Sequence, residues 1–498
     1  MSDLRFNIDV RVNSRSIVAL RGFTLRKGGI TFLLGESGIG KTLAARALFG
    51  LLDPDEFTVK INGLGYRTYL EQSELRSMQR DGFFVFQEPS SHLNPLMTVR
   101  QQLEEADLTG ATDPAVSLGE LWHAEAARDA VLIADLYPRP HRPSGGEKQR
   151  ILLAMALRKM DLVRDGGLEP GVFIFDEPTG SLDNPYRDLF IASLLSRFRH
   201  RRHTILFITH DYSLISHVLS EHRDLARVMD FRELVWEDEG LKIREFRPGL
   251  YSEWIQSLKR NRPDGTRSSS SEPRLHLEGT LRILGRELLI TSDPEGRLPC
   301  ALNVNAGRMV YLKAPSGTGK TSLAKAVMGL IPADRMRATV AGHPLTEATP
   351  HQVWHSLWGK ALTMVFQHAD EALNMHSSVA QTLAQLHAPG GSGRKEITTA
   401  LELLFDPAKV RSLVKRKVWM LSGGQKQRLN LVRGLMLGTD LLFIDEPLNG
   451  LDFESSTRVV AVIQHKLKEG QGVVAISHNE EIFDALVREQ DRYYLHAV

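Results

Sequence analysis

Short apolar runs alternate along this chain with longer stretches of helical periodicity. The apolar runs at 171–175 and 441–444 each lead directly into acidic residues, and helix-like stretches at 43–52 and 322–331 follow glycine-rich loops. Strands that alternate with helices predict an α/β fold with a largely parallel sheet. The segment 100–142 is rich in Ala, Leu and Glu, which predicts a helical insertion.

The same set of motifs occurs twice in the same order. A constant order of paired motifs predicts a duplicated domain with insertions and deletions in its loops. The pairs are the glycine-rich loops at 35–42 and 314–321, FVFQ at 84–87 with MVFQ at 364–367, SGGEKQR at 144–150 with SGGQKQR at 422–428, and IFDEP at 174–178 with FIDEP at 443–447.

The polar segment RNRPDGTRSSSSEPR at 260–274 separates the two copies. It is rich in serine and has no apolar periodicity, so it predicts a flexible linker. We therefore expect one domain at 1–259 and a second at 275–498, each large enough to bury a core of its own.

Composition excludes several classes of protein. Lys and Arg number 62 and Asp and Glu 60, so the net charge of +2 gives no overall attraction to nucleic acid, and no nucleic-acid partner is expected. Cys300 is the single cysteine, which excludes an internal disulfide and a cysteine-ligated metal site and fits a reducing, cytoplasmic location. No apolar run approaches the ~18–20 residues of a membrane span, and the first residues lack the apolar region of a secretory signal.

Each glycine-rich loop has the form of a phosphate-binding loop between a strand and a helix. Its backbone N–H groups would face phosphate oxygens, Lys41 or Lys320 would reach the β- and γ-phosphates, and Thr42 or Thr321 would hold Mg²⁺. Two coincidental glycine-rich turns are the alternative, which the other paired motifs oppose. The residues expected to cradle phosphate are Gly35, Ser37, Gly38, Gly40, Ser316, Gly317 and Gly319. In the second loop Ala314 replaces the opening glycine.

Two acidic residues end one buried strand in each copy. Asp176 and Glu177 follow GVFIF, and Asp445 and Glu446 follow LLFI, which places them at the carboxyl edge of the sheet. The first acid of each pair suits the magnesium shell, and the second suits the activation of the attacking water. Alone, such pairs could equally be solvated strand ends, but their place after a phosphate-binding loop favours catalysis.

A glutamine and a histidine end two further strands of each copy. Gln87 and Gln367 follow FFVF and TMVF, and His210 and His478 end TILFITH and GVVAISH. A glutamine can coordinate Mg²⁺ and position water, and an imidazole can donate to the γ-phosphate. Each residue alone would pass for ordinary loop polarity, but their recurrence at matched places favours a function.

These motifs resemble the ABC ATPase superfamily over nearly the whole chain. The most distinctive element is the signature sequence, present as LSGGQ at 421–425 and as PSGGE at 143–147. The resemblance implies two P-loop ABC ATPase domains, each with a mostly parallel sheet core and a helical subdomain, packed head to tail, with each ATP between the phosphate loop of one domain and the signature of the other. The residues that this implies at the nucleotide are Ser144, Gly145, Gly146, Ser422, Gly423 and Gly424, with Asp183 and Asp452 of the D-loops.

The segments after the two glutamines resemble one subgroup of that superfamily. QEPSSHLNP at 87–95 and QHADEALN at 367–374 are similar to the FQxPxxxLNP pattern of the dipeptide, oligopeptide and nickel importer ATPases. This resemblance implies an ATP- and Mg²⁺-dependent motor at the inner face of the cell membrane that drives two separate permease subunits and, through them, serves a solute-binding protein. The cysteine cluster common in that subgroup is missing, and no aromatic residue for adenine stacking is evident near Val12 or Ile283.

Other functions are less consistent with the sequence. A soluble tandem ABC ATPase acting on ribosomes or an enzyme assembly is the main alternative, but such translation factors usually have a long charged helical linker. The basic stretches at 199–203 and 415–417 are more typical of solvated surface than of a nucleic-acid site. DNA-repair relatives would need zinc modules or long coiled coils. The histidines 351, 355, 368 and 376 lack an added acidic ligand, which disfavours a metal site.

The departures from the family pattern fall unequally on the two expected nucleotide sites. In a head-to-tail pair, Ala314 would face the signature in which Pro143 and Glu147 replace leucine and glutamine. An added carboxylate near the γ-phosphate would oppose closure. We therefore expect the site with Lys320 to turn over less than the site with Lys41, unless Glu147 faces solvent.

Overall fold

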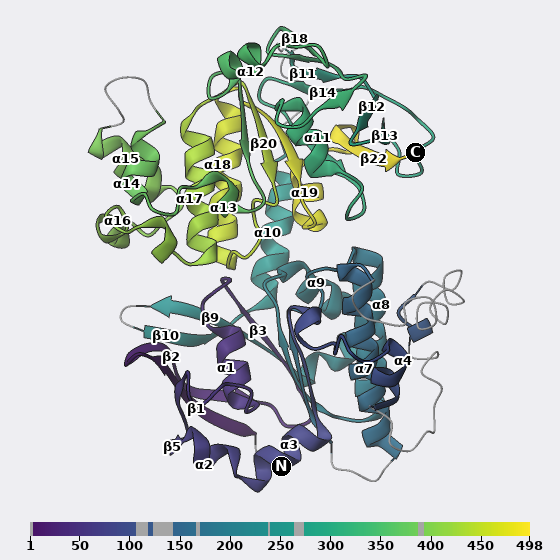
Figure 1. Ribbon diagram of the computed structural model, residues 1–498, viewed down its shortest axis with the longest axis vertical. Helices are drawn as coiled ribbons and strands as arrows, with labels where there is room; N and C mark the ends of the chain where they lie inside the picture. Colours follow the sequence, from purple (N-terminus) through teal and green to yellow (C-terminus); the bar gives the residue numbers. More distant parts are fainter. Residues whose placement is uncertain are drawn as a thin grey trace. The chain divides into compact units, whose positions relative to one another are not determined.

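The computed structural model describes residues 3–105, 118–122, 143–165, 170–237, 240–262, 273–386 and 393–498, apart from the side chains of 162–165 and 394. The chain divides into two compact units, 1–248 and 249–498, and each is an α/β domain (Figure 1). This division lies before the boundary at residue 259 that composition suggests. Residues 263–272 of the expected linker lie outside the described residues.

The described residues of the first unit form two sheets. One is antiparallel, with its strands in the order β2 (Arg15–Leu25), β1 (Leu4–Val12), β4 (Thr58–Ile61) and β5 (Leu64–Gly65). The other has the order β10 (Gly240–Glu245), β9 (Met229–Glu237), β3 (Ile30–Gly35), β8 (Thr204–Ile208), β7 (Val172–Asp176) and β6 (Phe83–Val85). From β9 to β6 all neighbours are parallel, and β10 pairs antiparallel at the edge.

The helices of the first unit connect these strands as the alternating pattern predicts. The longest described are α7 (Gly145–Asp165) and α8 (Asn184–His200), which pack against each other (Figure 1). The others are α1 (Lys41–Leu48), α2 (Tyr66–Leu70), α3 (Ser73–Asp81), α4 (Val99–Glu105) and α9 (Tyr212–Glu221), with 3-10 turns η1 (Pro89–Ser91) and η2 (Arg223–Val228). Of the predicted insertion, α4 is helical, and residues 106–117 and 123–142 lie outside the described residues.

The second unit repeats this arrangement. Its antiparallel sheet has the order β14 (Leu302–Asn305), β11 (Pro273–Leu277), β17 (Arg337–Val340) and β18 (His343–Thr346). Its larger sheet has the order β16 (Ala333–Asp334), β12 (Thr280–Ile283), β13 (Arg286–Thr291), β22 (Arg492–Ala497), β15 (Met309–Lys313), β21 (Gly472–Ile476), β20 (Leu441–Asp445) and β19 (Leu362–Val365). The strands from β22 to β19 are parallel and follow the order of the corresponding strands in the first unit, so the predicted duplication is seen in the fold.

The second unit has a larger set of described helices. They are α10 (Pro248–Arg260), α11 (Lys320–Val327), α12 (His351–Leu357), α13 (Ala369–Ala372), α14 (Val379–Ala384), α15 (Arg394–Glu402), α16 (Pro407–Leu413), α17 (Gly423–Met436), α18 (Phe453–Lys468) and α19 (Glu480–Leu486), with 3-10 turns η3 (Val418–Met420) and η4 (Glu489–Asp491). The group α14 to α16 forms the helical part that the sequence resemblance implies.

Helix α10 belongs with the second unit because of what it buries. Tyr251, Ile255 and Leu258 form its buried face, at the spacing of successive helical turns. The Tyr251 hydroxyl donates a hydrogen bond to Glu481 at 3.1 Å, and its ring lies 6.3 Å from that of Phe453. The helix therefore packs on α18 and α19.

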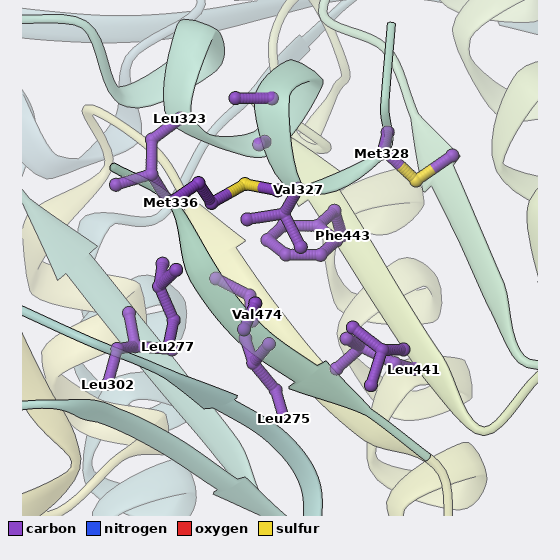
Figure 2. Close-up of a cluster of buried hydrophobic side chains, with 14 of the residues drawn as sticks. Leu275, Leu277, Leu302, Leu323, Val327, Met328, Met336, Leu441, Phe443 and Val474 are labelled. Carbon is purple, nitrogen blue, oxygen red and sulfur yellow. The ribbon is translucent and has the colours of Figure 1, made fainter. Parts of the chain in front are cut away.

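Buried apolar side chains hold the strands that carry the functional motifs. All five residues of β20 and of β21 are buried, as a parallel strand covered on both faces requires. Figure 2 shows Phe443 and Val474 of these strands packed among side chains of β11 and α11, including Leu275 and Val327. The carboxyl ends of the strands are therefore fixed by a rigid core. Among the described residues, no helix has the length and apolar character needed to cross a membrane.

Candidate nucleotide site in each unit

The two phosphate loops have the backbone that their glycines predict. Gly40 and Gly319 lie just before α1 and α11 with φ of 110° and 114°, in the left-handed region that glycine adopts without a Cβ clash. Lys41 Nζ donates to the carbonyl oxygens of Gly35 and Glu36 at 2.7 and 3.0 Å. The second loop folds in the same way, since Lys320 Nζ donates to the carbonyls of its first two residues.

The two loops begin differently. Gly35 has a φ of +138°, and a Cβ at this position would lie 2.6 Å from the carbonyl oxygen of Leu234. Ala314 stands at the matching place in the second unit and is not among the non-glycine residues with positive φ. The alanine is thus accommodated by another backbone conformation, and the two loops are not interchangeable at this position.

The threonine and the first acid expected at the metal lie together in both units. Thr42 Oγ1 donates to Asp176 Oδ1 at 3.0 Å, and Thr321 Oγ1 donates to Asp445 Oδ2 at 2.6 Å. Burial raises the pKa of Asp176 to about 6 and also raises that of Asp445. The other oxygen of Asp176 is buried without a hydrogen-bond partner. A hydroxyl and an unsatisfied carboxylate oxygen beside a phosphate loop fit the ligands that Mg²⁺ prefers.

In the first unit, two side chains converge on Glu177. Gln87 Nε2 donates to Glu177 Oε2 at 2.9 Å, and His210 Nδ1 lies 3.2 Å from Glu177 Oε1. Burial acts to raise the pKa of Glu177, but His210 and Lys41 outweigh it and lower that pKa below its ordinary value. Burial acts to lower the pKa of His210, but the contact with Glu177 raises it. Glu177 is therefore a carboxylate at neutral pH.

In the second unit, Glu446 has different neighbours. Ser477 Oγ donates to Glu446 Oε2 at 3.0 Å, while His478 Nε2 lies 3.6 Å from Oε1 and 3.4 Å from Ser316 Oγ. Gln367 follows β19, but within the described part of the chain its side chain forms no hydrogen bond to Glu446. Burial raises the pKa of Glu446 to about 7, and Asp445 adds to the increase.

Both glutamates lie on strained backbone. The φ of Glu177 is 46° and that of Glu446 is 47°, in a region that non-glycine residues rarely adopt. Hydrogen bonds from their N–H groups to the carbonyls of Ile208 and Ile476 fix this conformation. Such strain persists only where surrounding contacts maintain it, and it is concentrated at functional sites.

The signature sequences form the first turns of α7 and α17. Ser422 caps α17, its hydroxyl accepting from the N–H of Gln425 at 3.2 Å, while Gln425 Oε1 accepts from the N–H of Ser422 at 3.2 Å. Ser144 and Glu147 form the same reciprocal pair, with the Glu147 carboxylate 2.7 Å from the Ser144 nitrogen. Glu147 therefore performs the same capping as Gln425, folded back on its own helix end.

The remaining predicted residues lie at the starts of other helices. Gly145 and Gly146 open α7, and Gly423 and Gly424 open α17. Asp183 and Asp452 precede α8 and α18. Asp452 caps its helix, since its carboxylate accepts from the N–H of Ser455 at 2.7 Å. Gly38 and Gly317 take left-handed φ values of 78° and 76° within the two phosphate loops.

Several side chains near the sites were not predicted. Ser477 donates a hydrogen bond to Glu446. The sequence holds a signal for it, because ISH at 476–478 differs from the matching ITH at 208–210 at this position. Arg286 Nη1 donates to the carbonyl of Gly317 at 3.3 Å. Gln149 and Gln427 of the signature helices bond to backbone beside the two glutamates. No local sequence signal marks Arg286, because its contact depends on the fold.

The histidine-rich stretch does not form a metal cluster in the described part of the chain. His351 and His355 share one face of α12, and their rings lie 4.7 Å apart. Both rings also pack edge-on against Trp358, at 5.6 and 4.7 Å. Within the described ranges, no group of three or more His, Cys, Asp or Glu could hold a metal ion.

Comparison with known proteins agrees with this geometry. A family model described as ABC transporter matches residues 21–180 and 299–449, which is more than half of the chain. The chain belongs to the ABC transporter family. Because ATP-binding domains of this family are ATPases, the protein is an ABC ATPase with two such domains. The α/β fold with two ABC ATPase domains, predicted from the sequence, is confirmed.

Relatives of similar length carry transport names. The peptidoglycan transport ATP-binding protein YejF of Agrobacterium fabrum is 26% identical over 492 residues, covering 94% of this chain and 85% of the relative. The glutathione import ATP-binding protein GsiA of Escherichia coli K12 is 23% identical, covering 98% and 84%. The archaeal ribosome recycling factor aABCE1, solved with the ribosomal stalk protein aP1, aligns over 98% of this chain and 90% of its own with a TM-score of 0.61. At 18% identity, that likeness shows the fold alone.

Proposed function

We propose that this ABC ATPase is the motor subunit of an importer of peptides or a related small solute. It would drive two separate transmembrane permease chains from the inner face of the cell membrane and serve a solute-binding protein through them. The observation that carries the proposal is the pair of Q-loops, the segments 87–95 and 367–374 that begin with Gln87 and Gln367, each with exposed apolar side chains nearby. The transport names of the relatives over nearly the full chain support it.

Exposed apolar side chains lie near both Q-loops. Leu96, nine residues after Gln87, is 84% exposed. In the second unit, Trp419 and Met420 are 60% and 50% exposed, and the Trp419 N–H donates to the carbonyl of Met375, in the segment that follows Gln367. An adjacent pair of large exposed apolar side chains such as Trp419 and Met420 suits a protein contact.

We infer that corresponding residues have the same roles in both units. The loop lysine binds the β- and γ-phosphates, and the threonine, the first acid and the glutamine hold Mg²⁺. Magnesium would neutralise charge on the phosphates and orient them for hydrolysis. Glu177 or Glu446 takes the proton of the attacking water, and His210 or His478 donates to the γ-phosphate. The signature serines and glycines add contacts to nucleotide, as the family resemblance implies.

Coexpression of this chain with the transmembrane permease chains of a peptide importer tests the transport role. The chain should sediment with membranes only when the permease is present, and Trp419→Ser should weaken this association. Trp236→Ser is the matched control, because Trp236 is 52% exposed on β9 and far in sequence from either Q-loop. Equal sedimentation with and without permease would contradict the proposal. Sedimentation with ribosomes that survives moderate salt would instead favour the soluble tandem class.

A further inference from the structure

Two side chains of the signature helix α17 donate hydrogen bonds to the backbone of neighbouring segments. Gln427 and Asn430 lie three residues apart on this helix and are 5% and 1% exposed. Gln427 Nε2 donates to the carbonyl of Glu446 at 3.3 Å, and Asn430 Nδ2 donates to the carbonyl of Phe366 at 3.0 Å. Because Phe366 immediately precedes Gln367, the helix that begins at the signature holds both the candidate base and the start of the Q-loop.

Within its described residues, the first unit has one of these two contacts and not the other. Gln149 stands at the position of Gln427 and donates to the carbonyl of Pro178 at 3.0 Å, next to Glu177. Leu152 stands at the position of Asn430 and is fully buried. Leucine has no polar atom in its side chain, so α7 cannot hold the first Q-loop in this way.

The two Q-loop glutamines differ accordingly. In the first unit, Gln87 reaches Glu177 with a hydrogen bond of 2.9 Å. In the described part of the second unit, Gln367 makes no such bond to Glu446, whose Oε2 is bonded by Ser477 instead. Among the described residues, the presence of Asn430 thus coincides with a Q-loop glutamine that forms no hydrogen bond to the glutamate.

Asn430 places a polar amide at a buried position of the helix. Its Oδ1 is buried and has no hydrogen-bond partner, which lowers stability relative to a fully satisfied or apolar side chain. Leucine is accepted at the equivalent position of the first unit. The packing of this helix therefore does not require an amide, and the contact with the Q-loop backbone is what the asparagine adds.

We propose that Asn430 is a positioning residue that ties the Q-loop of the second unit to its signature helix. Movement of the signature end of α17 is then passed directly to Gln367, whereas the first unit lacks this connection. The proposal rests on the proposed roles of Gln367 at Mg²⁺ and of Glu446 as base. It assigns the second unit a linkage that its duplicate does not have.

The test measures the second unit alone, in a full-length chain carrying Glu177→Gln. In this background Asn430→Leu should lower kcat on the order of tenfold, because a displaced Gln367 positions metal and water poorly. The Mg²⁺ concentration for half-maximal turnover should rise, while the affinity for ATP without Mg²⁺ should stay the same. Asn430→Ala should have the same effects, because it shares with Asn430→Leu only the loss of the donor.

Gln471→Leu is the matched control in the same background. Gln471 is also a buried amide, 5% exposed, that donates to a backbone carbonyl, that of Thr439 at 2.7 Å, and its Oε1 also lacks a partner. Its replacement should change the free energy of unfolding as Asn430→Leu does and leave kcat and the Mg²⁺ dependence unchanged.

Three results would overturn the proposal. The first is an equal loss of turnover in the Asn430→Leu and Gln471→Leu variants, which would reflect stability alone. The second is normal turnover in Asn430→Leu with a loss in Asn430→Ala, which would reflect packing. The third is full turnover after Glu446→Gln in the same background, which would remove the proposed role of Glu446 first and the positioning role with it.

Discussion

The different surroundings of the two glutamates predict different pH dependences for the two units. Each unit can be followed alone by replacing the glutamate of the other, with Glu446→Gln leaving the first unit and Glu177→Gln leaving the second. A general base must be ionised to accept a proton, and kcat/KM reports its pKa in the free enzyme. The pKa of Glu446 is about 7, whereas that of Glu177 is below its ordinary value.

The size of the effect follows from these pKa values. With a pKa of about 7, Glu446 is about nine-tenths ionised at pH 8 and about one-tenth ionised at pH 6. Glu177 stays ionised over this range because His210 lowers its pKa. Titration of MgATP itself affects both variants equally. The ratio of kcat/KM for the second unit to that for the first should therefore fall about tenfold between pH 8 and pH 6.

Steady-state phosphate release by the two single variants provides the measurement, at subsaturating ATP and constant ionic strength. Adding His210→Gln to the variant that retains Glu177 should move the acidic limb of its profile to higher pH, because the contact that lowers the pKa of Glu177 is lost. A ratio that stays constant within about twofold from pH 6 to pH 8 would refute the reasoning.

Three further variants test parts of the structure. The folded pKa of Glu446 lies above its ordinary value of 4.5, so this glutamate lowers the stability of the fold as pH rises from 4.5 through 7. In urea unfolding, Glu446→Gln should therefore be about 3 kcal/mol more stable than the wild-type protein at pH 8 and equal to it at pH 4. No difference in the free energy of unfolding at pH 8 would contradict this. Gly35→Ala should weaken ATP binding measured by calorimetry, because the added Cβ would lie 2.6 Å from the carbonyl oxygen of Leu234. The alanine at position 314 of the second loop does not meet this clash. Unchanged affinity for ATP would show that the first loop relaxes. Glu147→Gln should leave the thermal midpoint of unfolding unchanged, because a glutamine caps α17 in the same way. Ser422→Ala should lower the free energy of unfolding by ~1 kcal/mol, because the cap of α17 is lost. Equal shifts of the thermal midpoint in both variants would count against the capping box.

The sequence predicts the parts of each site that are contiguous along the chain. The phosphate loops and the acids that end β7 and β20 are marked by local patterns, because glycine and strand-end carboxylates have backbone requirements that can be recognised in one segment. The parallel strands follow from the alternation of apolar runs and helical stretches. The duplicated motif order predicts the same strand order in both units, and the two sheets agree.

Contacts between distant segments could not be predicted in this way. The bonds from Asn430 to Phe366 and from Ser477 to Glu446 depend on how a helix and several strands pack, which no short pattern encodes. Other features do have a local signal in the sequence. The spacing of Tyr251, Ile255 and Leu258 indicates an amphipathic helix before the expected linker.

The capping role of Glu147 was also readable from the sequence. Ser144 and Glu147 have the S-x-x-E spacing of a capping box, which predicts a carboxylate folded onto its own helix end. The expectation that this carboxylate opposes nucleotide closure assumed that its oxygens were free to face phosphate. One oxygen of Glu147 lies 2.7 Å from the Ser144 nitrogen, and the effect of this carboxylate on nucleotide closure stays a prediction. A second difference between the units lies in the surroundings of Glu177 and Glu446.

Turnover and nucleotide stoichiometry of the Glu177→Gln, Glu446→Gln double variant test most directly that these two residues are the bases of an ATPase with two sites. At saturating MgATP we expect phosphate release to fall about 10²–10⁴-fold, while two nucleotides remain bound per chain because both phosphate loops are intact. Phosphate release equal to that of the wild-type protein, with both nucleotides bound, would contradict the assignment of Glu177 and Glu446.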